Sequence, residues 1–456
     1  MVLLWPVLPV ILVGFAPQSP GNPAQRANTQ AMVSRAAAAV PLLAIEDEAA
    51  RIRQSKQYFA EAKAASDADG GKLWGRPLYG PMIFLDTETR TIYANQPDPE
   101  HRLTEKNGVY ISKVGPEFPT GNTSTRFGGT TWTTIPFDNM PDTRIARARL
   151  MMHESFHRIQ NDLGLPPGQA RNVHLDDKDG RTWLRLEWRA LSVALVSWGP
   201  ERSQAIRDAL TFRAYRRSLY PDAAREEDRM EVHEGLAEYT GIALDGLDNQ
   251  SNRWFMAGRL KVDAQRPSYP YSFAYETGPA YGLLLDMGSQ DWRKGLTPAS
   301  SLSGLLAAAE HFQAPDPLES AAVERANAYR PADIFTSEDK REREREHAIA
   351  EYRRILVTGP VLELPLAHMN FSFNPNEVVP LGDEGNVYPT TTISDTWGTI
   401  EAQKGARINK TFSAAYVSAP TSADHLAGDG WKLSLKPGWK VVPGEKPGSF
   451  KVARMP

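Results

Sequence analysis

The fold of this chain is best interpreted from one stretch, Thr143-Arg-Ile-Ala-Arg-Ala-Arg-Leu-Met-Met-His-Glu-Ser-Phe-His-Arg-Ile-Gln160. It is rich in helix-forming residues, and Asp142 or Thr143 can cap its N-terminus. A Gly-Leu-Pro-Pro-Gly segment follows and ends the pattern. The sequence therefore predicts one helix that carries His153 and His157 near its middle.

His153, Glu154 and His157 form the pattern His-Glu-x-x-His within this predicted helix. Histidines at positions i and i+4 share one helix face, so both imidazoles can reach one zinc ion at about 2.0–2.1 Å. Glu154 lies one step further around the helix, where it can take a proton from the attacking water. The pattern indicates a zinc site with a general base beside it.

A zinc ion held by two histidines needs a third protein ligand, which must be a histidine or a carboxylate because the chain contains no cysteine. Two glutamates compete for this position. Glu187 lies on an apolar helical stripe, where a buried carboxylate needs a cation, a metal or a proton. Glu234 lies in the segment Met230–Gly241 and has a less apolar helical face. The residue pattern alone leaves both glutamates open.

The order of these motifs resembles that of the gluzincin metallopeptidases, including the thermolysin-related and aminopeptidase groups. The resemblance rests on His153–His157 followed by Glu234-Gly-Leu-Ala-Glu-Tyr239, and it implies that Glu234 is the third zinc ligand. The segment Tyr275-Glu-Thr-Gly278 is similar to the Tyr-x-Lys-Gly helix start of gluzincin aminopeptidases. This likeness implies that Tyr275 donates a hydrogen bond to the tetrahedral intermediate.

Two features depart from the family pattern. The chain between His157 and Glu234 is much longer, and it predicts two extra helices at about Thr182–Trp198 and Ser203–Leu219. The motif with which gluzincin aminopeptidases hold a substrate amino terminus is absent, and Phe127–Ile135 is the nearest upstream stretch. We expect that stretch to be a strand, either an ordinary one or the edge strand that aligns an extended peptide.

The N-terminus has the pattern of an export signal. Val2–Phe15 is almost wholly apolar, and Gly14 and Ala16 offer small residues for cleavage, although a basic start is missing. We therefore expect a signal peptide over residues 1–16, a flexible tether over 17–41, and a secreted or periplasmic protein. A buried N-terminal helix is the alternative.

Composition limits the other classes of function. The chain of 456 residues has 52 Lys and Arg against 55 Asp and Glu, so it lacks the charge of a nucleic-acid binder, and it has no polybasic block for a membrane. We expect an α+β fold, with a hairpin over residues 78–94 in a small N-terminal sheet. That sheet and a mainly helical, zincin-like catalytic body would occupy residues 42–359, followed by an all-β domain over 360–456.

Together these patterns predict a zinc-dependent peptidase that acts on a peptide or protein substrate and does not insert stably into a membrane. The predicted site comprises the zinc ligands His153, His157 and Glu234, the general base Glu154 and the oxyanion donor Tyr275. Glu187 is the alternative third ligand, or else a buried acid that orients a histidine. Two other functions stay open: a zinc hydrolase of a non-peptide substrate, and a non-catalytic exported binding protein whose metal site is structural or lost.

Overall fold

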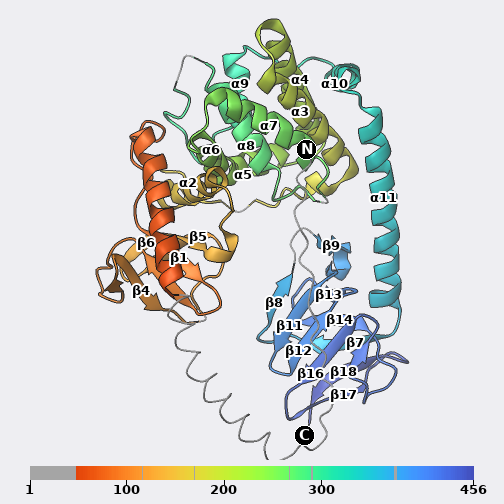
Figure 1. Cartoon of the computed structure of the whole chain (residues 1–456). Coiled ribbons are helices and arrows are strands. Elements are labelled where there is room, and N and C mark those ends of the chain that lie inside the picture. Colours follow the sequence, from red (N-terminus) through yellow and green to blue (C-terminus); the bar gives the residue numbers. More distant parts are fainter. Residues whose placement is uncertain are drawn as a thin grey trace, which may run out of the picture.

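The chain combines helices and strands, which confirms the predicted α+β class (Figure 1). In this computed structural model the described residues are 48–115, 117–168, 170–266, 268–288, 291–373 and 377–455. The predicted signal peptide and tether lie outside them. No helix in these ranges is both long enough and apolar enough to cross a lipid bilayer.

A six-stranded sheet forms the N-terminal part, with the strand order β3-β4-β2-β1-β6-β5. Its strands are β1 (Met82–Asp86), β2 (Thr91–Ala94), β3 (Thr104–Lys106), β4 (Val109–Lys113), β5 (Thr123–Phe127) and β6 (Thr130–Pro136). β1 and β2 form the predicted antiparallel hairpin, and β6 runs parallel to β1. Helical residues 48–69 pack on one face of this sheet.

The two edge strands of this sheet, as far as the structure describes it, are β3 and β5, so the prediction that Phe127–Ile135 could be an edge strand was wrong. Most of that stretch belongs to β6, which pairs with β1 on one side and with β5 on the other. The residues from Trp132 to Pro136 are all buried, which suits an inner strand. β5 instead alternates between partly and fully exposed residues, and it takes the outer position in the part of the sheet that the structure describes.

The helix α2 (Arg144–Gln160) lies between the sheet and the helical body. Thr143 caps it by accepting a hydrogen bond from the N–H of Ala146, as one of the two predicted caps. Met151 packs into the core against the sheet, whereas Phe156 packs into the core of the helical body. Because two faces of α2 are covered by separate cores, its remaining face carries the histidines.

The helical body contains the two helices that were predicted between the ligand-bearing segments, α3 (Lys178–Val196) and α4 (Gly199–Ser218). Its other helices are α5 (Ala223–Met230), α6 (Leu236–Ala243), α7 (Asn249–Asp263), α8 (Ala274–Leu285), α9 (Leu302–Ala309) and α10 (Leu318–Ala326). One large hydrophobic core joins these helices. The body also encloses charged side chains, and they are paired with opposite charges, as in the pairs Arg181–Glu338 and Arg213–Glu187.

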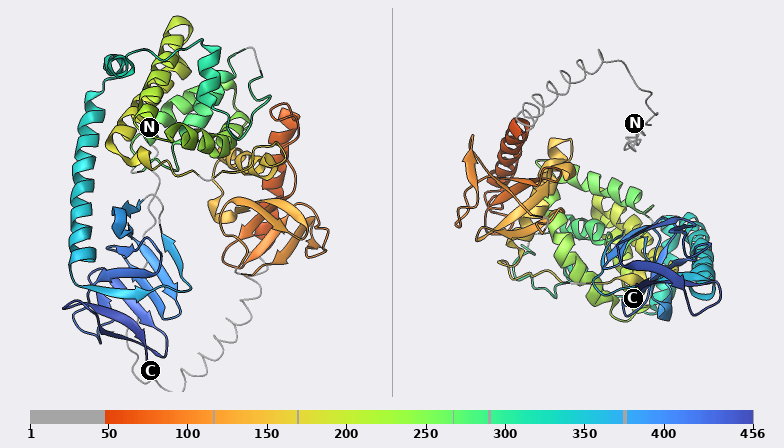
Figure 2. Two further views of the ribbon diagram at one scale, coloured as in Figure 1. Left: turned by 180° about the vertical axis from the view of Figure 1, so that it is seen from behind. Right: turned by 90° about the horizontal axis from the view of Figure 1, so that it is seen from below.

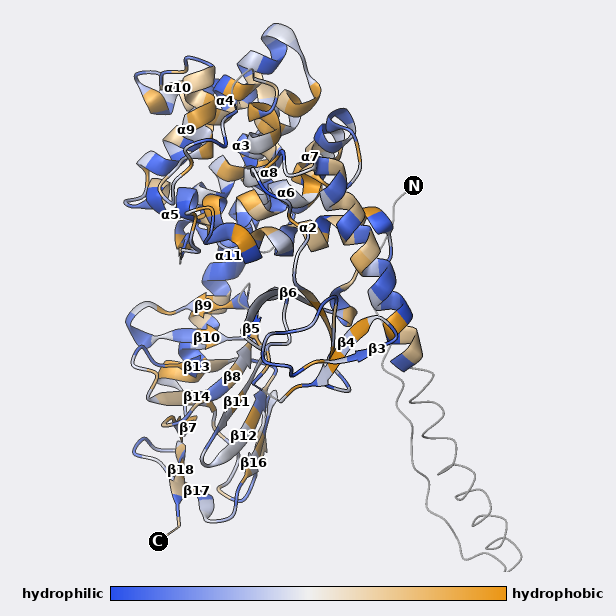
Figure 3. Cartoon of the chain, turned by 90° about the vertical axis from the view of Figure 1, so that its left-hand side faces the viewer, coloured by the Kyte–Doolittle hydropathy of each residue, from blue (hydrophilic) through white to orange (hydrophobic). Residues whose placement is uncertain are grey.

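The long helix α11 (Ala332–Arg353) runs along the edge of the molecule from the helical body to the C-terminal region (Figures 1 and 2). Glu338 fixes it to the body, because this buried carboxylate pairs with Arg181 at 2.8 Å and with Arg185 at 2.6 Å. Hydrophilic residues dominate the rest of the helix (Figure 3). Further contacts with the body follow along the helix, from Asp333 with Arg189 to Arg345 with Asp177, so α11 joins the body over more than its first half.

The C-terminal region is all-β, as predicted. One sheet has the order β17-β18-β7-β14-β13-β10-β9, and the other has the order β15-β16-β12-β11-β8. The strands are β7 (Val361–Pro365), β8 (Asn370–Phe373), β9 (Val379–Pro380), β10 (Asn386–Tyr388), β11 (Thr391–Asp395), β12 (Gly398–Ala402), β13 (Ala406–Ile408), β14 (Ala414–Ser418), β15 (Ala427–Gly428), β16 (Trp431–Leu435), β17 (Trp439–Pro443) and β18 (Phe450–Arg454). Trp397 and Trp431 are buried in a core formed by both sheets, which is separate from the core of the helical body.

Candidate metal centre

His153, His157 and Glu234 lie together, although Glu234 comes from a different helix. The Nε2 atoms of the two histidines are 3.1 Å apart, and Oε2 of Glu234 is 3.6 Å from His153 Nε2 and 3.4 Å from His157 Nε2. In a tetrahedral site with zinc-ligand distances of about 2.0–2.1 Å, neighbouring ligand atoms are roughly 3.3–3.4 Å apart. The three side chains therefore have a spacing at which they can hold one metal ion.

Glu234 lies in a continuous helical segment that runs from α5 through the π-helical turn η3 (Glu231–Gly235) into α6. π-helical turns are rare and often occur at functional sites. α6 packs directly on α2, because a Cβ atom on Gly241 would lie only 2.5 Å from the carbonyl oxygen of Arg149. This close packing places the carboxylates of Glu234 and Glu238 opposite the histidines of α2.

α8 approaches the same segment closely, because two glycines face each other. A Cβ atom on Gly278 would lie 2.3 Å from the Cα atom of Gly235, so only hydrogen fits at this contact. Tyr275 stands one helical turn before Gly278. The glycine contact therefore brings the hydroxyl group of Tyr275 to Glu234.

The second ring nitrogen of His153 faces a carboxylate. Its Nδ1 atom is 2.8 Å from Oε2 of Glu238. Burial raises the pKa of Glu238, but the charge of Arg259 and the hydrogen bond with His153 outweigh this effect and lower it to about 2. An ionised carboxylate only accepts hydrogen bonds, so Nδ1 carries the hydrogen and, in the neutral ring, Nε2 carries a lone pair.

The second ring nitrogen of His157 faces an amide oxygen. Its Nδ1 atom is 3.0 Å from Oε1 of Gln160. The amide has this orientation because its Nε2 group donates to the carbonyl oxygens of Val232 at 3.2 Å and of His233 at 3.4 Å. Nδ1 of His157 is therefore a donor, and its Nε2 atom also presents a lone pair in the neutral ring.

Three acceptor atoms thus converge in this cluster, and such an arrangement requires a positive charge. In the metal-free protein, burial opposes protonation of His153, but Glu234 and Glu238 outweigh it and raise the pKa of His153 to about 10. Burial alone would raise the pKa of Glu234, but hydrogen bonds with both histidines hold it well below its usual value. A metal ion would replace the proton of His153, and two imidazoles with one carboxylate form a donor set that suits zinc.

Glu154 lies beside the cluster with one carboxylate oxygen unused. The residue is buried, and its Oε2 atom has no hydrogen-bond partner among the described residues. Burial raises the pKa of Glu154 above its usual value. A carboxylate of raised pKa with a free oxygen can accept a proton, as a general base requires.

Tyr275 belongs to the same cluster. Its hydroxyl group donates to Oε2 of Glu234 at 2.6 Å, and its ring stacks on the imidazole of His153 with the centroids 5.6 Å apart. Burial and the charge of Glu234 raise the pKa of Tyr275, so the phenol keeps its proton. A hydrogen bond from Tyr275 to a substrate requires this hydroxyl group to leave Glu234.

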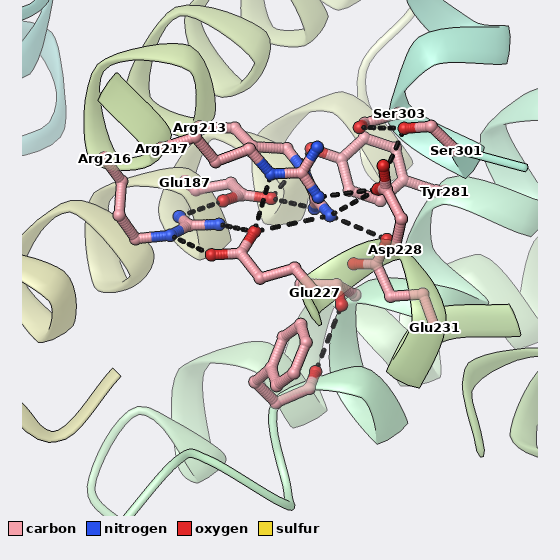
Figure 4. A network of polar contacts seen from close by, with 12 residues as sticks. Glu187, Arg213, Arg216, Arg217, Glu227, Asp228, Glu231, Tyr281, Ser301 and Ser303 are labelled. Atoms are coloured by element: carbon pink, nitrogen blue, oxygen red, sulfur yellow. Dashed lines mark hydrogen bonds and ion pairs between the residues drawn. The ribbon is translucent and has the colours of Figure 1, made fainter. Parts of the chain in front are cut away.

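Glu187 lies apart from the histidines, so its proposed roles as third ligand or as an acid that orients a histidine were wrong. It is fully buried on α3 and pairs with Arg213 at 2.9 Å and with Arg216. Tyr281 donates a further hydrogen bond to it at 2.8 Å. Figure 4 shows these arginines among the carboxylates. The cation that a buried Glu187 needs is therefore a guanidinium group.

Sequence reasoning assigned no role to Glu238 or Arg259, although both support the cluster. Glu238 stands one helical turn after Glu234, and this spacing was a usable signal. Arg259 comes from α7, forms an ion pair with Glu238 and lies 3.0 Å from Glu276. Nothing in the local sequence indicates this contact, because it depends on how α6, α7 and α8 pack.

The cluster opens into a cavity of about 700 Å³ that follows α2. β5 and the residue before it form one wall, with Asn122, Thr123 and Ser124. Further lining residues outside the cluster are Ala146, Arg149, Leu150, Asn161, Pro167 and His233. Its lining residues on α2 run from Ala146 to Gln160, so the cavity extends beyond the metal cluster.

Comparisons with known protein families, with curated proteins and with solved structures found no match for the chain. The fold and the site define an α+β protein with an all-β C-terminal region and a His-His-Glu cluster that can hold a metal ion.

Proposed function

We propose that this protein is a zinc-dependent metallopeptidase with a zincin-like catalytic body. One observation carries the proposal: three acceptor atoms of His153, His157 and Glu234 converge, while the Nδ1 atoms of both histidines are already engaged. Two histidines and one glutamate are the protein ligands of thermolysin-type zinc sites, in which the fourth position is left for water or substrate. The adjoining cavity supports such an open site.

Each residue of the cluster has its own role in the proposed reaction. A zinc ion bound there would polarise the scissile carbonyl group and lower the pKa of a water molecule. Glu154 takes the proton from the attacking water and passes it to the leaving amine. The hydroxyl group of Tyr275 donates to Glu234 in the structure. It donates a hydrogen bond to the developing oxyanion once it has left Glu234 and turned to the substrate. Glu238 and Gln160 hold the two imidazoles in the required tautomers.

The position of β5 supports a peptide as the substrate. This strand is one of the two edge strands of the described sheet, and its residues Thr123 and Ser124 line the cavity. An edge strand offers backbone N–H and C=O groups that can pair with an extended peptide. A compact non-peptide substrate would not need such a wall, so the peptidase is favoured over the non-peptide hydrolase.

Export remains part of the proposal. It depends on the apolar segment Val2–Phe15, which lies outside the described residues. N-terminal sequencing of the protein from the outer fraction of expressing cells tests it. A mature N-terminus near residue 17 is expected, and an unprocessed chain that stays in the cytoplasm would contradict export.

Metal analysis combined with turnover tests the function. Plasma mass spectrometry of the purified protein should find about one zinc per chain. Glu154→Gln should retain the zinc and lose cleavage of a casein-type substrate by about 10²- to 10⁴-fold. Glu201→Gln is the matched control, because Glu201 is exposed at the start of α4 and has no role in the site.

Other results would support the alternatives. A zinc protein that hydrolyses esters but no peptide would be the non-peptide hydrolase. If Glu154→Gln leaves every activity of the protein unchanged, the metal site is structural and the binding protein is the better description. A protein that contains no zinc, even after refilling, would refute the catalytic proposal.

A further inference from the structure

Arg149 adds a cation to the wall of the cavity. It stands one helical turn before His153 on α2 and lines the same cavity. Among the described residues that line the cavity, it is the one lysine or arginine. Residues at i and i+4 share a helix face and are separated by about 6 Å along the axis. Arg149 therefore lies beside the metal cluster on the side towards the start of α2.

The guanidinium group of Arg149 is held from two sides. Its Nε group donates to Oδ2 of Asp245 at 2.7 Å, and its Nη2 atom is 2.7 Å from the same oxygen. Asp245 has a fully buried side chain and also accepts a hydrogen bond from the N–H of Leu247. The ring of Phe255 lies against the guanidinium group, with 3.6 Å between Cζ and the ring centroid. The planar group is thus fixed in place before any ligand binds.

One end of this guanidinium group remains available. Asp245 engages Nε and Nη2, while Nη1 has no hydrogen-bond partner in the part of the chain that the structure describes. The side chain keeps 17% of its surface exposed where it lines the cavity. Away from the metal cluster, a carboxylate that entered the cavity would meet no other lysine or arginine among the described lining residues. Arg149 is therefore the group on this wall that can receive a negative charge.

We propose that Arg149 binds a carboxylate of the substrate and so selects peptides that carry one about two residues from the cleaved bond. The proposal rests on the proposed peptidase function. An extended chain advances about 3.3–3.6 Å per residue, so two residues span roughly the 6 Å between the level of His153 and that of Arg149. The carboxylate can be the free C-terminus of a released dipeptide or an Asp or Glu side chain, because guanidinium binds both by the same charge-assisted hydrogen bonds.

Peptide binding without turnover tests the proposal. Zinc-loaded Glu154→Gln protein is immobilised and exposed to randomised hexapeptide pools. One pair of pools differs only in a free or amidated C-terminus, and a second, amidated pair differs only in Glu or Gln at one position. The carboxylate form of at least one pair should be retained about 10-fold to 100-fold better. The pair that responds identifies the source of the carboxylate.

A double variant separates recognition from folding. Arg149→Met alone would leave Asp245 buried without its cation, so Arg149→Met is combined with Asp245→Asn. In the Glu154→Gln background this double variant should lose the preference while keeping its zinc content and thermal midpoint. Arg149→Lys should keep part of the preference, because it retains the charge but not the planar fork.

The proposal is overturned if both forms of each pair bind equally, if no pool binds, or if the double variant keeps the preference. These results are distinct from failure of the proposed function. An enzyme that contains zinc and cleaves casein without any carboxylate preference would remain a peptidase. A protein that binds acidic peptides through Arg149 but never cleaves them would be a carboxylate-binding protein.

Discussion

The buried carboxylates around Glu187 and those around Glu234 form two clusters in the described helical body, and the clusters differ in what faces each carboxylate. Around Glu187, guanidinium groups lie between the acids, as Figure 4 shows. Around Glu234, the neighbours are two imidazole nitrogens that present lone pairs. The first cluster contains permanent guanidinium cations, whereas the second gains its positive charge only when His153 is protonated or a metal ion binds. Burial of an acid therefore does not identify a metal site, and the type of neighbour does.

One continuous helix contributes to both clusters. Glu231 lies in η3 and receives a hydrogen bond from Arg213 at 2.6 Å, while Glu234 in the same turn faces the histidines of α2. Residues three apart in this turn point in different directions, because a helical turn does not close after three residues. Glu231 therefore packs among arginines, whereas Glu234 meets imidazoles. The comparison yields four predictions, from the largest expected effect to the smallest.

Glu234→Ala should weaken metal binding more than any other of these changes. The change removes one of the three converging acceptors, and loss of a supporting partner alone costs about 10- to 100-fold in affinity. We expect zinc affinity to fall by about 10³-fold or more, with the overall fold retained. Competition with a fluorescent zinc chelator measures the affinity. Chelation of the wild-type protein should reproduce the loss of activity, and retention of full zinc content by Glu234→Ala would contradict the assigned ligand set.

Glu187→Ala should unfold the protein more readily but leave the metal site intact. The variant leaves Arg213 and Arg216 buried without one of their partners, which typically costs about 3–5 kcal/mol. Urea denaturation gives the free energy of unfolding, and metal analysis of the folded fraction gives the zinc content. Glu201→Ala, at an exposed site, should change the stability by less than about 0.5 kcal/mol. If Glu187→Ala lost its zinc at unchanged stability, Glu187 would support the metal site rather than the fold, which would contradict this prediction.

Glu238→Gln should weaken metal binding moderately. The variant keeps an oxygen acceptor for Nδ1 of His153 but removes the charge that also pairs with Arg259. We expect zinc affinity to fall by about 10- to 100-fold, which is the usual effect of losing a supporting partner. The same chelator competition measures it. An unchanged affinity would show that the tautomer of His153 does not depend on Glu238.

Glu61→Gln should have a small effect that depends on pH. Arg147 on α2 donates two hydrogen bonds of 2.8 Å to Glu61 in the N-terminal helix. Burial raises the pKa of Glu61, but these bonds outweigh it and lower the pKa below its usual value of 4.5. The carboxylate therefore contributes stability above that value, and the contribution is lost as pH falls through the lowered pKa. The variant should be less stable by about 1 kcal/mol at pH 7.

Denaturation at two pH values checks this last prediction. The difference between Glu61→Gln and wild type should be present at pH 7 and should shrink in strong acid, where Glu61 of the wild type is protonated too. A difference that stays constant with pH would mean that packing, rather than charge, accounts for the effect. The change in stability caused by losing the Glu61–Arg147 ion pair can then be compared with the changes measured for the two buried clusters.

Local features of the fold were predictable because they depend on neighbours in the chain. The cap at Thr143, the hairpin of β1 and β2, and the extra helices α3 and α4 all follow from spacing and turn residues. The edge strand was not predictable in the same way. β5 and β6 both have β-prone residues, and only the pairing of β6 with β1 leaves β5 at the edge.

By itself, the sequence determined that His153 and His157 share one helix face with Glu154 beside them, because helical geometry links residues four apart. It also determined that a buried Glu187 would need a positive partner. Only the tertiary structure decided what that partner is. Arg213 and Arg216 reach Glu187 from α4, while the glycine contact between η3 and α8 brings Tyr275 to Glu234. Such contacts join side chains from separate helices, and their distances depend on packing that no local pattern records.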